Sequence, residues 1–250
     1  MKRAAVVATA LALILAAQPA AAKPKVSGEI TVFAAASLTE SFTAIAKQFD
    51  KKYPDVTVRF DFDASSNLAA QIQQGAPADV FASADEANLQ KAIDSRDVIA
   101  PPLVFAKNRL EIAVESGNPK KIKRLADLAK PGLVVVLCAD AVPCGKYAAE
   151  AFTKAGVEVS AASKEENAKA ALSKVSLGEA DAAVVYVTDV KAAKSDVSGV
   201  RIPDRQNVLA TYPAGLVMRS QESAGAKAWL RFLESKEAQR TLQKFGFLLP

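Results

Sequence analysis

Short apolar runs alternate along this chain with segments of helical periodicity. The strand-like runs lie at residues 29–35, 56–62, 79–83, 110–115, 133–138, 182–187 and 214–219. Between residues 38 and 52, apolar side chains recur at the spacing that places them on one face of a helix: Leu38, Phe42, Ile45, Ala46 and Phe49. This alternation predicts an α/β fold in which helices connect the strands of mostly parallel sheets.

Proline and glycine mark the ends of the predicted helices. Pro54 follows the helix at 38–52, and Gly75, Gly156 and Gly178 follow helices predicted at 66–74, 143–155 and 164–177. Glycine is common just past a helix because it adopts the left-handed backbone conformation at little cost. Two further helices are predicted at 224–234 and 236–245.

Two segments, 105–109 and 212–214, are predicted to cross between two lobes. The sequence contains no internal repeat or long linker that would instead separate domains in series. The chain would leave the first lobe, build the second and return. Residues 23–106 and 214–250 are therefore expected to form lobe 1, and residues 107–213 lobe 2.

Residues 1–22 have the pattern of a secretory signal peptide. Lys2 and Arg3 precede an apolar run at 4–17, Pro19 interrupts it, and the small residues at 20–22 predict cleavage after Ala22. The run is shorter than the roughly 20 residues that a membrane-spanning helix needs. No cysteine follows it to carry a lipid. We therefore expect a periplasmic protein without a stable membrane anchor. The sequence has no positive signal for dimerisation, so a monomer is expected.

Charge and composition exclude several classes of function. The formal net charge is +5, or +3 without Lys2 and Arg3, and basic and acidic residues are interspersed, so nucleic acid is not an expected partner. The chain contains no histidine, which removes Ser-His-Asp and Cys-His catalysis and the usual histidine metal sites. A secreted hydrolase with Ser37 as nucleophile is the alternative from another class, but no activating base or Ser-x-x-Lys motif accompanies that serine. We expect the protein not to be an enzyme.

Cys138 and Cys144 are the only cysteines. In an oxidising compartment two cysteines six residues apart can close a small loop as a disulfide, and two free thiols are the less favoured alternative. Spacing alone does not decide between them because the pairing requires a specific geometry.

Four predicted helix starts, within 33–40, 64–68, 142–145 and 163–168, can present unpaired backbone N–H groups. The first and the last have the spacing of a capping box, Ser37 with Glu40 and Ser163 with Glu166. The first N–H groups of a helix lack intrahelical partners and favour anions, and in open α/β sheets such turns lie where ligands bind. Taken alone, a serine at such a start is usually only an N-cap. Tyr186, at the end of an apolar run, would be an ordinary half-buried sheet tyrosine.

Five motifs resemble periplasmic molybdate-binding proteins of ABC transporters, members of the type II periplasmic binding protein family. They are ITVFAAASLTE at 30–40, QGAPADVFASAD at 74–85, VPCGKY at 142–147, GEADAAVVYVTD at 178–189 and FGF at 245–247. They occur in the family's order through nearly the whole chain after the signal peptide. The resemblance implies two α/β lobes joined by two crossing strands, with an oxyanion bound in the cleft between the lobes.

The resemblance also implies which residues bind the anion. Ser37 and Ser65 match serines that donate hydroxyl and backbone N–H groups, and Tyr186 matches a tyrosine whose hydroxyl donates. Cys144 falls where the family uses the backbone N–H of a small residue, usually alanine. Ala168 falls where the family uses the backbone N–H of a residue that is often valine. The implied ligand is molybdate or tungstate and not a cofactor, and the implied partner is the permease of an ABC importer. A sulfate- or phosphate-binding protein of the same fold is the nearest alternative. Ferric binding is disfavoured because the five positions include one tyrosine and no carboxylate.

Overall fold

The strands of the described residues, 26–220 and 223–250 of the computed structural model, pair in one mixed sheet. Their order is β2-β1-β3-β9-β4-β7-β5-β6, and β8 pairs with β4 outside this path. The strands are β1 (Gly28–Ala35), β2 (Val56–Asp63), β3 (Val80–Ala82), β4 (Leu103–Glu115), β5 (Val135–Cys138), β6 (Ser163–Glu165), β7 (Ala182–Tyr186), β8 (Val197–Arg201) and β9 (Leu209–Leu216). The predicted signal peptide at 1–22 lies outside the described residues.

Helices connect these strands. The α-helices are α1 (Thr39–Lys52), α2 (Ser65–Gln73), α3 (Glu86–Asp94), α4 (Pro143–Ala155), α5 (Ala168–Ser176), α6 (Val187–Ala193), α7 (Ala224–Leu233) and α8 (Lys236–Phe245). Three short 3-10 helices accompany them: η1 (Ala36–Leu38), η2 (Leu125–Ala129) and η3 (Met218–Ser220). Helices α4 and α8 begin and end at the residues predicted from the sequence.

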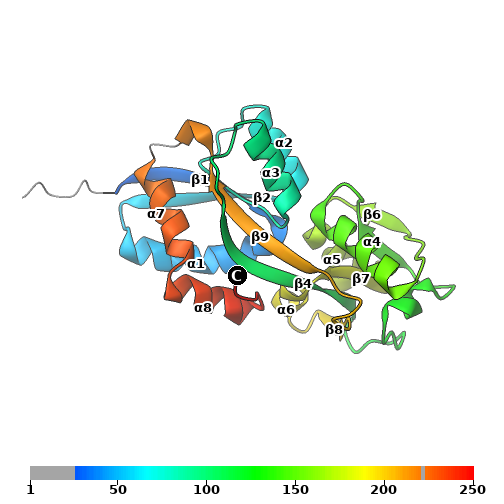
Figure 1. The fold of residues 1–250 in the computed structure, drawn as a ribbon. Helices are drawn as coiled ribbons and strands as arrows, with labels where there is room; N and C mark the ends of the chain where they lie inside the picture. Colours follow the sequence, from blue (N-terminus) through cyan, green and yellow to red (C-terminus); the bar gives the residue numbers. More distant parts are fainter. Residues whose placement is uncertain (1–25, 221–222) are drawn as a thin grey trace, which may run out of the picture.

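The molecule consists of two halves joined by β4 and β9 (Figure 1). In the first half β1 runs parallel to β2 and β3, with α1, α2, α3, α7 and α8 around them. In the second half β5 runs parallel to β6 and β7, with α4, α5 and α6. β4 pairs with β9 through Arg109 and with β7 from Leu110 onward, so it passes from one half into the other. This arrangement confirms the predicted two-lobed α/β architecture. The lobe boundaries at 106/107 and 213/214 fall inside the two crossing strands and stay a prediction.

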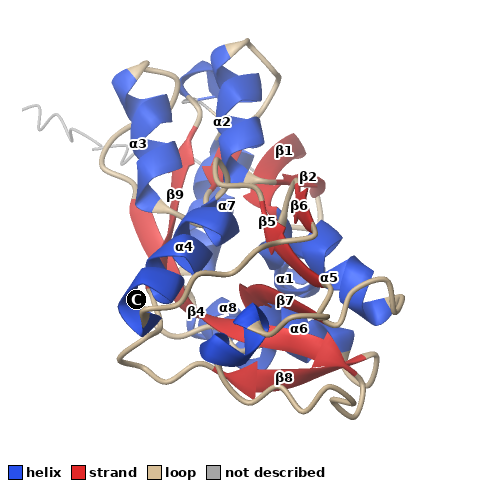
Figure 2. Ribbon diagram, turned by 90° about the vertical axis from the view of Figure 1, so that its right-hand side faces the viewer, coloured by secondary structure: helices blue, strands red, loops and turns tan. Residues whose placement is uncertain are grey.

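The side-chain alternation of β1 separates two apolar cores in the first half. Val32 and Ala34 pack into a core that includes α1, α7 and α8, whereas Phe33 faces a second core formed with α2 and α3. Figure 2 shows α2 and α3 lying beside each other. Trp229 of α7 meets the rings of Phe42 and Phe49 edge-on, at centroid distances of 5.6 and 5.3 Å. Both faces of the sheet are therefore covered, as its parallel pairings require.

The structure differs from the sequence-based expectations mainly at the crossing strands. β4 begins seven residues before the predicted 110, and β9 covers 209–216 where 214–219 was predicted. Lys107, Asn108 and Arg109 interrupt the apolar pattern of β4, and its antiparallel partner β9 compensates through backbone pairing. The elements β6, β8, α3 and α6 were missed. The predicted helix at 164–177 begins at Ala168 because residues 163–165 pair with β5 as strand β6.

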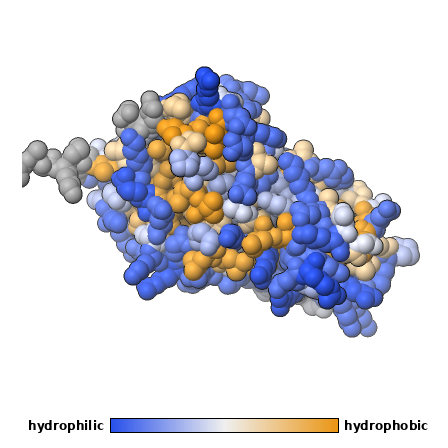
Figure 3. All heavy atoms as spheres, in the orientation of Figure 1, coloured by the Kyte–Doolittle hydropathy of each residue, from blue (hydrophilic) through white to orange (hydrophobic). Residues whose placement is uncertain are grey.

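Within the described residues no helix combines the length and apolar character that would let it cross a membrane. On the face that Figure 3 presents, hydrophilic residues cover much of the surface and apolar residues gather in patches toward its middle.

Candidate functional site

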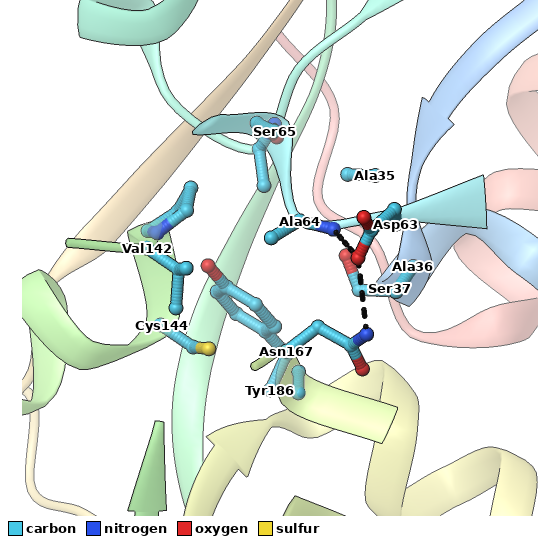
Figure 4. A pocket seen from close by; sticks show the side chains of 13 residues that line it. Ala35, Ala36, Ser37, Asp63, Ala64, Ser65, Val142, Cys144, Asn167 and Tyr186 are labelled. Atoms are coloured by element: carbon cyan, nitrogen blue, oxygen red, sulfur yellow. Dashed lines mark hydrogen bonds between the residues drawn. The ribbon is translucent and has the colours of Figure 1, made fainter. Parts of the chain in front are cut away.

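A pocket with an empty volume of about 230 Å³, its opening included, lies between the two halves. Its lining comprises Ala35, Ala36, Ser37, Asp63, Ala64, Ser65, Ala84, Val142, Pro143, Cys144, Asn167, Ala168 and Tyr186. Figure 4 shows side chains of both halves facing this space. The structure thus brings together all five residues singled out in the sequence: Ser37, Ser65, Cys144, Ala168 and Tyr186. It also adds residues that the sequence did not single out, above all Asp63 and Asn167.

Three helices begin at the pocket. Helix α2 starts at Ser65, α4 at Pro143 with Cys144 second, and α5 at Ala168. The first N–H groups of a helix have no intrahelical acceptor, and the aligned peptide dipoles make this end positive. The pocket therefore collects backbone donors and positive potential from both halves without a positively charged side chain in its lining.

Both serines are buried and already have partners in the protein. Ser65 Oγ accepts a hydrogen bond from the backbone N–H of Ala84 at 2.9 Å, so the Ser65 hydroxyl proton stays available. Ser37 Oγ lies 2.8 Å from the hydroxyl of Tyr212. The predicted capping box of Ser37 and Glu40 is wrong: Ser37 lies in η1, and α1 begins at Thr39 without a side-chain cap.

Among the described residues that line the pocket, Tyr186 carries the buried side-chain polar atom that lacks a hydrogen-bond partner. Tyr186 ends β7, is 2% exposed, and its hydroxyl has no hydrogen bond to any described residue. Figure 4 shows this hydroxyl pointing into the space between the labelled residues of the two halves. Burial raises the pKa of Tyr186 well above its ordinary value, so the group stays a protonated donor. A buried hydroxyl without an acceptor is costly, and a bound acceptor would remove that cost.

A disulfide fixes the start of α4 to the end of β5. Cys138 and Cys144 are joined, with an S–S distance of 2.07 Å and a Cα–Cα distance of 5.8 Å, so the structure contains the bridge that their spacing left open. Gly145 follows directly, and a Cβ there would lie 2.0 Å from the carbonyl oxygen of Ala139. The disulfide holds the first turn of α4 against the preceding loop, and the missing side chain of Gly145 allows this close approach.

Asn167 holds the start of α5 and reaches across the pocket. Its Oδ1 accepts from the backbone N–H of Ala170 at 3.0 Å, and its Nδ2 donates to Asp63 Oδ1 at 3.3 Å (Figure 4). The predicted capping box of Ser163 and Glu166 is therefore wrong, because Asn167 is the N-cap. An asparagine directly before an apolar helix was the signal that would have identified it.

Both carboxylate oxygens of Asp63 are occupied. Besides Asn167, Oδ1 accepts from the N–H of Ala64 at 2.6 Å, and Oδ2 accepts from Asn67 Nδ2 at 3.0 Å. The one carboxylate in the lining thus organises the start of α2. Asp63 directly follows the predicted strand at 56–62, and this position was the signal available in the sequence.

Lys169 forms a second link between the halves. Its ammonium group lies 2.7 Å from Glu40 Oε1 on α1 and 3.6 Å from Asp189 Oδ1 on α6. Asp189 is buried and accepts the backbone N–H of Tyr186 at 3.1 Å. Burial raises the pKa of Asp189 to about 6, against the lowering influence of Lys169 and of the Tyr186 N–H.

The chain matches a known protein family over most of its length. Residues 30–248 match the family described as bacterial extracellular solute-binding protein. The molybdate-binding protein ModA of Mycobacterium tuberculosis (strain H37Rv) is 39% identical over 221 residues, covering 88% of this chain and 85% of that protein. ModA of Escherichia coli (strain K12) is 33% identical over 232 residues, covering 89% and 90%.

Solved structures share the fold. The periplasmic molybdate-binding protein of Azotobacter vinelandii superposes with a TM-score of 0.78 at 21% identity, covering 88% of this chain and 99% of that chain. The sulfate-binding protein SubI of Mycobacterium tuberculosis H37Rv also gives 0.78, at 20% identity, with 88% and 86% covered. The sequence and family matches show that this chain belongs to the bacterial extracellular solute-binding proteins, in the family of the ModA molybdate-binding proteins.

Proposed function

We propose that this protein binds molybdate or tungstate in the pocket between its halves and presents it to the permease of an ABC importer. The observation that carries the proposal is the buried Tyr186 hydroxyl, which lacks a partner and faces a pocket where three helices begin. Ser37, Ser65 and Tyr186 would donate hydroxyl protons, and Ser37, Ser65, Cys144 and Ala168 backbone N–H groups. Neutral donors in a water-poor site can hold a dianion without a paired cation.

The donor set favours an anion that carries no proton. Its available groups donate, and the carboxylate oxygens of Asp63 are engaged by Ala64, Asn67 and Asn167. A protonated anion such as hydrogen phosphate would bring a hydroxyl without an acceptor, which carries a penalty of about 1–3 kcal/mol. Molybdate, tungstate and sulfate meet the requirement. We propose that size separates the first two from the smaller sulfate, and the names of the relatives favour molybdate.

The protein is proposed to capture its ligand without turning it over. Ser37, the candidate nucleophile, lies beside Tyr212, and the sequence contains no histidine to activate it. The proposal includes secretion to the periplasm with cleavage after Ala22, and closure of lobe 1 (23–106 and 214–250) on lobe 2 (107–213).

A binding panel tests the function. The purified, chelator-treated protein is heated with molybdate, tungstate, sulfate, phosphate or ferric citrate, and calorimetry gives dissociation constants for those that shift the melting temperature. A ligand at about 100 times its dissociation constant stabilises the native state by about 2.7 kcal/mol, which corresponds to roughly 5–10 °C for a protein of this size. We expect that shift with molybdate and tungstate. A shift with sulfate or phosphate alone would keep the fold and overturn the ligand, and no shift at all would overturn oxyanion capture.

A further inference from the structure

A chain of buried polar side chains runs from the two crossing strands to the pocket. Asn108 of β4 donates from Nδ2 to Thr188 Oγ1 at 2.9 Å and to the Tyr212 hydroxyl at 3.4 Å. Tyr212 of β9 lies 2.8 Å from Ser37 Oγ in η1. Asn108 and Tyr212 are fully buried, and neither belongs to the lining of the pocket. Among the hydrogen bonds of the described residues, the bond to Ser37 joins this pair to the lining of the pocket, and the Tyr212 ring also packs against Tyr186.

The direction of these hydrogen bonds follows from the chemistry of the groups. The backbone N–H of Arg109 donates to Asn108 Oδ1 at 2.9 Å, which fixes the orientation of the amide and turns Nδ2 toward Tyr212. An amide nitrogen donates and does not accept. The oxygen of Tyr212 must therefore accept from Asn108, and the Tyr212 proton goes to Ser37 Oγ, its acceptor among the described residues.

This direction leaves the proton of Ser37 free. The Ser37 oxygen accepts from Tyr212, so its own O–H can point elsewhere, and Ser37 lines the pocket. In the opposite arrangement Ser37 would donate to Tyr212, and the Tyr212 proton would have no acceptor in this buried place. A buried donor without an acceptor is penalised by about 1–3 kcal/mol.

The position of the Tyr212 hydroxyl is set by packing. The ring makes edge-on contacts with Tyr186, Phe247 and Phe105, at centroid distances of 5.9, 5.3 and 6.4 Å. Burial raises the pKa of Tyr212 above its ordinary value, so the hydroxyl keeps its proton throughout the neutral range. Three aromatic neighbours thus hold a permanent donor against Ser37.

We propose that Tyr212, oriented by Asn108, is a positioning residue for anion binding that holds Ser37 so that its hydroxyl proton faces the bound oxyanion. The inference rests on the proposed function of the pocket. It extends the site from the residues of its lining to the strands that join the halves. The Asn108 amide also donates to Thr188, two residues after Tyr186, so one side chain contacts both the partner of Ser37 and the segment that follows Tyr186.

Tyr212→Phe tests the proposal because it keeps the ring and removes only the hydroxyl. We expect calorimetry with molybdate to show affinity weakened about tenfold, the effect of one misdirected hydrogen bond to an anion. The same substitution in a Ser37→Ala background should change affinity less than twofold, since no hydroxyl remains to be oriented. Tyr53→Phe is the matched control, because it removes a hydroxyl from another ring packed on a phenylalanine, Phe49, outside the pocket lining.

A merely structural role for Tyr212 would give a different result. It would weaken binding equally in the wild-type and Ser37→Ala backgrounds, and that additivity would overturn the proposal, as would unchanged affinity in Tyr212→Phe alone. If the wild-type protein binds none of the anions, the proposed function fails and this role fails with it. Wild-type binding with additive effects would refute the role of Tyr212 alone.

Asn108→Asp provides a second test if Tyr212→Phe does not fold. A carboxylate at this position accepts, so Tyr212 would donate to it and Ser37 would have to donate to Tyr212. We expect a loss of affinity at least as large as that of Ser37→Ala. The added negative charge weakens binding both in the wild-type and in the Ser37→Ala background. The difference between the two losses of affinity therefore measures the contribution of the Ser37 orientation. Equal losses in both backgrounds would again contradict the proposal.

Discussion

Each half contributes one wall of the pocket, the first with Ser37 and Ser65 and the second with Cys144, Ala168 and Tyr186. Both walls are built from turns between a strand and a helix, but they hold their hydrogen-bond donors differently. In the first half the hydroxyls of Ser37 and Ser65 already have protein partners, the Tyr212 hydroxyl and the N–H of Ala84. In the second half the start of α4 is fixed by the disulfide at Cys144, while the Tyr186 hydroxyl has no partner. The serine oxygens of the first wall therefore accept hydrogen bonds from the protein without ligand, whereas the Tyr186 hydroxyl of the second wall has no protein partner and would gain one from a bound anion.

This contrast separates stability from binding. A group that is satisfied by the protein contributes to the native state with or without ligand, so its removal should lower both stability and affinity. A group that only the ligand satisfies contributes to affinity alone, and its removal can even stabilise the empty protein. Substitutions in the two walls should therefore differ in whether the affinity for molybdate and the stability of the empty protein fall together.

Tyr186→Phe should have the largest effect. It removes a donor to a charged ligand, worth about 1.5–3 kcal/mol, so affinity should fall roughly 10- to 100-fold. The melting temperature of the ligand-free protein should stay the same or rise, because an unpartnered buried hydroxyl disappears. Calorimetry and thermal unfolding measure the two quantities. Tyr147→Phe on α4 is the control, since Tyr147 is outside the pocket lining. Unchanged affinity in Tyr186→Phe would contradict the proposal that the bound anion accepts a hydrogen bond from the Tyr186 hydroxyl.

Ser65→Ala should lower affinity and stability together. The substitution removes a hydroxyl donor to the anion, and it also leaves the buried N–H of Ala84 without its acceptor. We expect about tenfold weaker binding and a loss of about 1–3 kcal/mol in the free energy of unfolding, measured by calorimetry and urea titration. Ser163→Ala, an exposed serine of the second half, should change neither. Loss of affinity without loss of stability would place Ser65 in the same class as Tyr186.

Removal of the disulfide should affect binding less than stability. Cys138→Ala with Cys144→Ala keeps the backbone N–H at residue 144 but frees the loop before α4. Closing so short a loop is worth about 2 kcal/mol in the chain-entropy model. Affinity should fall a few-fold, since Gly145 still packs on Ala139. The double variant and the wild type treated with reductant should agree. A loss as large as that of Tyr186→Phe would show that the bridge is essential to the donor geometry.

The sequence was informative where local pattern and structure coincide. The helix starts at Ser65 and Pro143 follow from small or capping residues after apolar strands, and the motifs around Ser37 and Tyr186 resemble a known family. Asn167 was missed because the serine three residues before Glu166 offered a competing capping box, and only pairing with β5 makes that serine part of a strand. Tyr212 gave no local signal, since its role depends on a partner 175 residues away in the chain. Long-range contacts of this kind are not encoded in periodicity.

The smallest effect on affinity is expected at Lys169, which links the walls without lining the pocket. Lys169→Met should weaken binding about two- to threefold, because a partly exposed ion pair contributes roughly 1 kcal/mol or less. Lys174→Met, which breaks an ion pair with Glu179 inside the second half, should not change affinity. Equal effects of the two substitutions would show that Glu40–Lys169 does not couple the walls.

The same lysine should also govern the pH dependence of stability. Asp189 has a pKa of about 6 in the folded protein, above its ordinary value of 3.8, so the native state holds its proton more tightly than the unfolded state does. The contribution of Asp189 to stability is therefore greatest below about pH 4 and declines as the pH rises through 6. Without Lys169 the carboxylate loses the charge that lowers its pKa, and the decline should extend to higher pH. Urea titrations of wild type, Lys169→Met and Asp189→Asn between pH 4 and 8 measure this, and Asp189→Asn should remove the component altogether. An unchanged pH profile in Lys169→Met would show that the ammonium group does not act on Asp189. Glu40 and Lys169 would then have no electrostatic connection to the carboxylate that accepts the backbone N–H of Tyr186.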